Sequence, residues 1–143
     1  MGKKRVLFVC VHNSARSQIA EAFLKKLGGD RFEVESAGLE PGNLNPLGIT
    51  VMKEAGIDIS QNQTKSVFDF FAQGKRYEYV ITVCDESQSS KCPVFPGFSA
   101  ARTIHWSFDD PASFPGTGEE KLEKTRVVRD KIRSRIMEFI KEI

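Results

Sequence analysis

A cysteine and an arginine near the N-terminus have the types and the spacing for anion chemistry. The segment Cys10–Ser17, CVHNSARS, lies between a short apolar run and an amphipathic stretch, with five residues between Cys10 and Arg16. A loop of this length that closes on a helix N-terminus turns several backbone N–H groups toward one point, where the helix dipole adds positive charge. Arg16 would bind two oxygens of a tetrahedral anion through a bidentate fork. The same positive field would stabilise the Cys10 thiolate, which is the nucleophilic form.

The remaining residues of this segment are expected to shape the anion site. Ser17 is placed to hydrogen-bond the sulfur of Cys10. Asn13 tolerates a positive φ and forms local hydrogen bonds, so it would hold the loop in shape. The residues expected to bind the oxyanion are Val11, His12, Asn13, Ser14, Ala15 and Arg16, mostly through the backbone. His12 is predicted to be an exposed loop residue, with a general base as the alternative.

A purely structural explanation of the same residues is an inert, buried Cys10 with Arg16 in a surface ion pair. A cysteine and an arginine at this spacing occur by chance in many chains. A strand, a Cys-x5-Arg-Ser segment and an amphipathic helix within the first 27 residues are a much rarer combination. The context therefore favours a functional site.

Two further cysteines indicate redox chemistry. Cys84 follows the apolar run Tyr79–Val83, and Cys92 lies in the polar segment Asp85–Ala101, which we predict to be mobile and at the surface. If the strands that end at Cys10 and Cys84 are parallel, both thiols lie at the same edge of the sheet. Three thiols in a chain without an export signal argue against a structural disulfide framework. Mobile backbone beside a reactive thiol suits thiol–disulfide exchange.

Each of these two cysteines also has another explanation. Alone, Cys84 would be a buried strand residue and Cys92 an exposed bystander. A zinc site from the three cysteines and His12 or His105 is a further alternative, although seven residues between two cysteines is unlike the usual structural zinc spacing.

Hydrophobic patterning predicts strands that alternate with helices. The predicted strands are Arg5–Val9, Phe32–Ser36, Tyr79–Val83 and Thr103–Trp106. The predicted helices are Ser17–Leu27, which Gly28 and Gly29 end, Pro46–Ala55, Ser66–Ala72 and Glu119–Ile140. The expected inward residues of the last helix are Leu122, Val128, Ile132, Ile136 and Ile140. This alternation predicts an α/β fold with a parallel sheet.

Length and composition exclude several classes of protein. The 143 residues fit one domain over residues 1–143, and 40% hydrophobic with 28% charged residues is ordinary for a globular protein. A net charge of +2 without a basic stripe gives no sign of a nucleic-acid partner. No apolar run is long enough to cross a membrane or to act as a secretory signal, so we expect a cytoplasmic location. We also expect a monomer.

Three parts of the sequence together resemble the low-molecular-weight protein tyrosine phosphatase superfamily. Besides the Cys10–Ser17 loop, Ser36–Ala37–Gly38 is similar to its short S-A-G signature and Asp110–Pro111 to its general-acid D-P pair. The resemblance implies a three-layer fold with a four-stranded parallel sheet in the order 2-1-3-4, flanked by helices. It also implies that Asp110 is the general acid. The alternative is that Asp110 is only a cap ahead of Pro111, and the choice of Asp110 over Asp109 comes from the resemblance.

The three thiols narrow the resemblance to the thioredoxin-coupled arsenate reductases, a branch of that superfamily. The similar segments are TVCDESQSSKCPVFP and HWSFDDPA. The resemblance implies that Cys10 attacks arsenate while Asp110 protonates the leaving oxygen. Cys84 then attacks Cys10, which releases arsenite and leaves a Cys10–Cys84 disulfide. Cys92 converts this to a Cys84–Cys92 disulfide, which reduced thioredoxin opens.

Two alternative functions fit fewer of these residues. A phosphatase that hydrolyses phosphate monoesters through a cysteinyl-phosphate would carry paired tyrosines after the acid, whereas Ala112–Ser113–Phe114 follow here. A sensor that binds arsenic or a metal with three thiols has no use for Arg16 or Asp110.

The cofactor expectations are mostly negative. No glycine fingerprint for a dinucleotide follows a strand, so no bound cofactor or metal is expected, and electrons would come from thioredoxin. Some relatives hold a potassium ion near the anion loop with an Asn, a Glu and a downstream acid. Asn13 and Glu21 are present, but Ser66 stands at the position of the acid. The sequence therefore does not support a potassium site.

Overall fold

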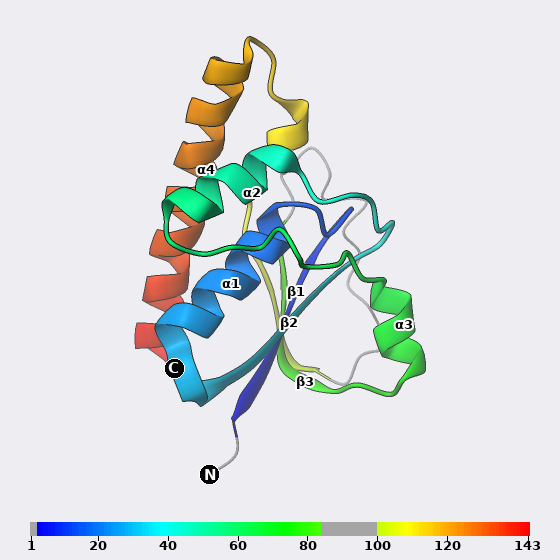
Figure 1. Cartoon of the computed structure of the whole chain (residues 1–143). Helices are drawn as coiled ribbons and strands as arrows, with labels where there is room; N and C mark the ends of the chain where they lie inside the picture. Colours follow the sequence, from blue (N-terminus) through cyan, green and yellow to red (C-terminus); the bar gives the residue numbers. More distant parts are fainter. Residues whose placement is uncertain (1–2, 84–99) are drawn as a thin grey trace.

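The computed structural model describes residues 3–83 and 100–143 (Figure 1). Cys84, Cys92 and both predicted disulfides lie outside the described residues, as does most of the predicted surface segment Asp85–Ala101. Its last two residues, Ala100 and Ala101, begin a strand.

The described residues contain one sheet of four parallel strands in the order β2-β1-β3-β4. The strands are β1 (Lys4–Cys10), β2 (Phe32–Gly38), β3 (Tyr77–Thr82) and β4 (Ala100–His105). Their order and direction confirm the predicted fold. Because all strands run the same way, their carboxyl ends share one edge, where Cys10 of β1 pairs with Gly38 of β2.

The central strand β1 supplies side chains to both faces of the sheet. Val6 and Phe8 belong to the larger hydrophobic core, while Leu7 and Val9 belong to a smaller core on the opposite face. All four side chains are fully buried. Burial on both faces explains why this strand is a continuous apolar run in the sequence.

Helices cover both faces of the sheet (Figure 1). On the larger core lie α1 (Arg16–Gly28), α2 (Pro46–Glu54) and α4 (Gly118–Glu142), whereas α3 (Val67–Ala72) covers the smaller core. The helix α1 ends where Gly29 takes a positive φ of 57°, as the Gly28–Gly29 pair predicts. No helix within residues 3–83 and 100–143 is long and apolar enough to cross a membrane.

Two predicted details need correction. The last strand begins at Ala100 and ends at His105, one residue before Trp106, whose buried ring lies 5.9 Å from the ring of Phe8. The buried positions of α4 are Thr125, Val128, Ile132, Ile136 and Phe139. The predicted positions Leu122 and Ile140 are only partly buried. At the C-terminal end of α4, Phe139 rather than its neighbour Ile140 faces inward, where its ring packs against Tyr79 at 5.2 Å.

Candidate active site

The loop between β1 and α1 lies at the carboxyl edge of the sheet, and the segment after β2 fixes its carbonyl groups. Backbone N–H groups donate from Leu39 to Cys10 (3.3 Å), from Glu40 to Val11 (2.8 Å), from Gly42 to His12 (3.1 Å) and from Asn45 to Ser14 (3.0 Å). The carbonyl and the N–H of a trans peptide point in opposite directions, so N–H groups are turned to the other side of the loop. The start of α1 at Ala15 also lacks a side-chain cap. This backbone arrangement suits an anion.

Gly38 allows the loop to approach β2 closely. A Cβ at this position would lie 2.8 Å from the backbone nitrogen of Asn13 and 2.8 Å from the carbonyl oxygen of Val11. Neither atom can move without displacing the loop. The glycine of the Ser36–Ala37–Gly38 signature is therefore required by contact with the anion loop.

Asn13 organises the interior of the loop, as its residue type predicts. It is fully buried and has a φ of 53°. Its Oδ1 accepts hydrogen bonds from the backbone N–H of Lys65 (3.0 Å) and from Gln18 Nε2 (3.1 Å). Since a backbone N–H can only donate, this fixes the orientation of the amide. The two hydrogens of Nδ2 go to Ser17 Oγ (2.7 Å) and Ser36 Oγ (2.9 Å).

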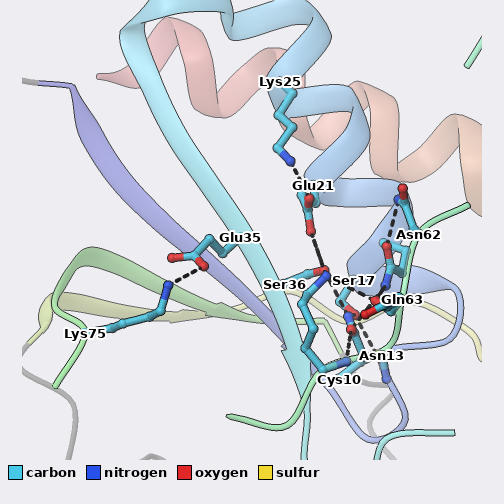
Figure 2. Close-up of polar contacts among 12 residues, drawn as sticks. Cys10, Asn13, Ser17, Glu21, Lys25, Glu35, Ser36, Asn62, Gln63 and Lys75 are labelled. Atoms are coloured by element: carbon cyan, nitrogen blue, oxygen red, sulfur yellow. Dashed lines mark hydrogen bonds and ion pairs between the residues drawn. The ribbon is translucent and has the colours of Figure 1, made fainter. Parts of the chain in front are cut away.

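The same hydrogen bonds direct a donor to the sulfur of Cys10 (Figure 2). Ser17 Oγ accepts from Asn13, so its own hydrogen can point to Cys10 Sγ, which lies 2.9 Å away. The backbone N–H of Asn13 donates to the same sulfur at 3.2 Å. Cys10 is only 2% exposed. Two hydrogen-bond donors therefore converge on one buried sulfur.

A buried carboxylate ends this series of hydrogen bonds. Ser36 Oγ donates to Glu21 Oε1 at 2.5 Å, and Ser36 in turn accepts from Asn13. The series therefore runs from Glu21 through Ser36, Asn13 and Ser17 to Cys10 (Figure 2). We call these five residues the cysteine network. Sequence reasoning missed the part played by Ser36 and Glu21, because their contact depends on how α1 lies over β2.

Arg16 and Asp110 meet above the loop, although 94 positions separate them in the sequence. Arg16 is 3% exposed. Its Nη1 donates to the carbonyl of Phe108 (3.1 Å), and its Nη2 lies 3.4 Å from Asp110 Oδ2. The guanidinium thus links the first loop of the chain to the segment before α4.

The structure separates Asp110 from Asp109, which the sequence alone does not. Asp109 is exposed, whereas the Asp110 side chain is 13% exposed and contacts Arg16. Asp110 Oδ1 also accepts from the backbone N–H of Ala112 (3.0 Å) and caps a short 3-10 helix that begins at Pro111. Asp110 therefore caps the 3-10 helix and also lies beside the loop that carries Arg16.

This geometry can be compared with known proteins. Residues 5–143 match the family described as low molecular weight phosphotyrosine protein phosphatase. The chain belongs to this family.

Several relatives in this phosphatase family are named arsenate reductases. The arsenate reductase of Bacillus licheniformis is 45% identical over 139 residues, which cover 97% of this chain and 96% of that protein. A solved structure described as an arsenate reductase in the phosphate binding state has a TM-score of 0.79 at 34% identity, with 98% of both chains covered. A thioredoxin-dependent arsenate reductase of Corynebacterium glutamicum has a TM-score of 0.67 at 30% identity, covering 99% of this chain and 62% of that one.

A pocket of about 690 Å³ opens beside the loop between β1 and α1. It is lined by His12 and Ser14 of the loop, by Asn45 and Leu47, and by Phe114, which follows Asp110 in the sequence. His12 is exposed, as predicted, and its Nδ1 lies 2.8 Å from the carbonyl oxygen of Glu40. The pocket is larger than a tetrahedral oxyanion needs, and Phe114 gives it an aromatic wall.

The described chain stops one residue short of Cys84, at the edge that carries Cys10. The backbone N–H of Val83 donates to the carbonyl of Val9 (2.8 Å). The chain therefore leaves β3 beside the end of β1. Within residues 3–83 and 100–143 no cluster of three or more His, Cys, Asp or Glu side chains could hold a metal ion. The zinc alternative rests on Cys84 and Cys92, outside those ranges.

The potassium site that the resemblance suggested is a poor fit for the residues around Glu21. Lys25 Nζ lies 2.6 Å from Glu21 Oε2, and Lys65 Nζ lies 3.8 Å from Oε1. Asn13 Oδ1 already accepts from two N–H groups. The oxygens that would face a cation are thus turned toward N–H donors and ammonium groups.

Proposed function

We propose that this protein reduces arsenate to arsenite, using Cys10, Cys84 and Cys92 in turn and reduced thioredoxin as the electron donor. The observation that carries the proposal is a buried Cys10 sulfur with two hydrogen-bond donors, in a loop whose Arg16 contacts Asp110. The names of the relatives support arsenate as the substrate. One solved relative is named as thioredoxin-dependent.

Arsenate binding would use the loop and Arg16. The N–H groups from Val11 to Arg16, apart from that of Asn13, which donates to Cys10 Sγ, would surround three oxygens. The Arg16 fork would turn from Asp110 to two of these oxygens. Asp110 would then face the fourth oxygen and share a proton with it. The oxyanion and Asp110 therefore compete for the same guanidinium, which places the acid beside its target as the anion arrives.

The first chemical step forms a sulfur–arsenic bond. The Cys10 thiolate attacks the arsenic of hydrogen arsenate, the bond from arsenic to its hydroxyl group breaks, and that hydroxyl takes a proton from Asp110 and leaves as water. No electrons have yet moved to arsenic. A phosphatase would hydrolyse the corresponding phosphorus compound at this point and would need no further thiol.

The second thiol supplies the reduction. The Cys84 thiolate attacks Cys10 Sγ, a sulfur–sulfur bond forms, and the electron pair of the sulfur–arsenic bond goes to arsenic, which leaves as arsenite. Attack of Cys92 on Cys84 frees Cys10 and moves the disulfide to Cys84–Cys92, which thioredoxin reduces. The backbone N–H of Val83, the residue before Cys84, donates a hydrogen bond to the carbonyl of Val9, the residue before Cys10.

The test is turnover of arsenate with thioredoxin, thioredoxin reductase and NADPH, in wild type and in the Cys10→Ser, Cys84→Ser and Cys92→Ser variants. We expect each variant to lose multiple turnover. Cys92→Ser is expected to stop with a Cys10–Cys84 disulfide, visible by mass mapping. Continued turnover without Cys84 or Cys92 would rule out the three-thiol sequence.

The aromatic wall of the pocket favours a second activity, hydrolysis of small aryl phosphates. Phe114 lines the space beside the loop where an aryl group would extend. Hydrolysis of p-nitrophenyl phosphate by the Cys84→Ser/Cys92→Ser variant, lost on Cys10→Ser, would establish it. No hydrolysis at millimolar substrate would exclude it.

A further inference from the structure

Two lysine ammonium groups meet the buried carboxylate at the end of the cysteine network. Glu21 is 7% exposed. Lys25, one turn further along α1, binds its Oε2 at 2.6 Å, and Lys65, from the segment before α3, approaches its Oε1 at 3.8 Å. A charge this well buried requires compensation by charge and hydrogen bonds.

We infer that Lys25 and Lys65 stand in for the alkali cation of other family members, so that the active site of this chain works without potassium. The two lysines are positioning residues, since they reach Cys10 only through Glu21, Ser36 and Asn13. This inference rests on the proposed function for its kinetic test.

The reason lies in the direction of the hydrogen bonds. Ser36 donates to the Glu21 carboxylate and accepts from Asn13. The ammonium groups of Lys25 and Lys65 face the two oxygens of this carboxylate and compensate its buried charge, as a bound cation would. A carboxylate without this compensation would turn toward other partners, and Ser36 would lose its acceptor. The Ser17 hydrogen would then no longer be directed to Cys10.

Lys65 acts on the network at two points. Its backbone N–H donates to Asn13 Oδ1 (3.0 Å), and its Nζ donates to the carbonyl of Gln63 (3.2 Å) while it faces Glu21. The backbone bond remains when the side chain is changed. A substitution at Lys65 can therefore remove the charge while the amide of Asn13 keeps its orientation.

Solvent ions can reach this carboxylate from outside the active site. A groove of about 480 Å³ is lined by Glu21, Lys25 and Asn62, among others. A small cation added to the buffer can thus replace a missing ammonium group, whereas tetramethylammonium is too large to bind a carboxylate closely.

The experiment compares wild type with Lys25→Met/Lys65→Met in potassium chloride and in tetramethylammonium chloride of equal ionic strength. The readouts are kcat/KM for arsenate and, separately, the rate at which iodoacetamide alkylates Cys10, mapped by mass spectrometry. We expect wild type to be equal in both salts. The double variant should lose about tenfold in both rates in tetramethylammonium and recover part of the loss in potassium.

Three further variants separate charge from structure. Lys131→Met, at an exposed position of α4 away from this groove, should match wild type. Lys25→Met/Lys65→Arg keeps one cation and should retain most of the wild-type rate. The single variant Lys65→Met repeats the salt comparison if the double variant does not fold. The inference is overturned if potassium accelerates wild type, or if the double variant is unchanged or loses equally in both salts. Alkylation of Cys10 reports on the network even if the protein reduces no arsenate, so the two proposals fail separately.

Discussion

In the proposed mechanism, Arg16 is the residue that takes part in both anion binding and proton transfer. In the free protein its guanidinium holds the carbonyl of Phe108 and the carboxylate of Asp110. An incoming oxyanion offers the same fork a pair of oxygens with more charge. In the proposed mechanism, occupation of the loop would free Asp110 from Arg16 at the moment when a proton donor is needed. A single buried side chain would thus connect anion binding to the proposed acid.

The Arg16→Lys variant tests whether the guanidinium binds the oxyanion through two hydrogen bonds, because lysine keeps the positive charge and lacks the fork. We expect the affinity for sulfate or arsenate to fall about tenfold to a hundredfold, because an ammonium cannot form the bidentate fork. Isothermal titration calorimetry at fixed ionic strength measures the change. Arg133→Lys, exposed on α4, is the matched control. Equal dissociation constants for wild type and Arg16→Lys would show that the fork does not hold the anion.

At the scale of elements, local patterns could be predicted from the sequence and long-range contacts could not. The Cys10 to Arg16 spacing and the Gly28–Gly29 stop are local, and both lie where they were expected. The contact of Glu21 with Ser36 depends on how α1 lies over β2, which no local pattern encodes. Phe139 and Ile140 are both apolar neighbours, so only the tertiary packing decides which of them faces inward.

The pairing of β1 with β2 also makes a prediction at this scale. Gly38→Ala would place a Cβ 2.8 Å from loop backbone atoms, so the loop must shift. We expect a loss of about 1–3 kcal/mol in the free energy of unfolding. Sulfate binding should weaken as well, because the N–H groups are displaced.

Urea unfolding and sulfate titration measure both effects. Gly118→Ala is the control, since a Cβ at Gly118 meets no atom within 4 Å and alanine favours the start of α4. If Gly38→Ala matches Gly118→Ala in stability and in sulfate affinity, the close approach of loop and strand does not matter.

Across the whole molecule, the site and one stabilising cluster lie in different parts of the sheet. The anion loop is at the carboxyl edge, whereas Glu35 of β2 binds Lys75 (2.8 Å), Tyr77 (3.1 Å) and Arg5 (3.4 Å) near the starts of β3 and β1. Figure 2 shows the Glu35–Lys75 pair set apart from the cysteine network. Burial and the charge of Glu35 raise the pKa of Tyr77, so its hydroxyl stays a neutral donor. The contacts of Glu35 connect β2 with the starts of β1 and β3, and none of them involves a residue of the proposed active site.

Acid should therefore weaken the fold through Glu35. Burial raises the pKa of this carboxyl, but the hydrogen bond and charge of Lys75, the Tyr77 hydroxyl and the charge of Arg5 together hold it below its ordinary value of 4.5. A carboxyl with a lowered pKa in the folded state stabilises the fold above its unfolded pKa and loses this effect as the pH falls through its folded pKa.

The measurement compares urea unfolding of wild type and Glu35→Gln at pH 7 and near pH 3. Because Glu35 is partly exposed, solvent screening limits the expected difference to about 1 kcal/mol or less at pH 7, and it should shrink at pH 3. Glu78→Gln, exposed on β3, is the control and should follow wild type at both values. Arsenate reduction at pH 7 should be unchanged in Glu35→Gln, since this carboxylate belongs to the stability of the sheet. A difference that is the same at both pH values would show that the side chain contributes packing rather than charge.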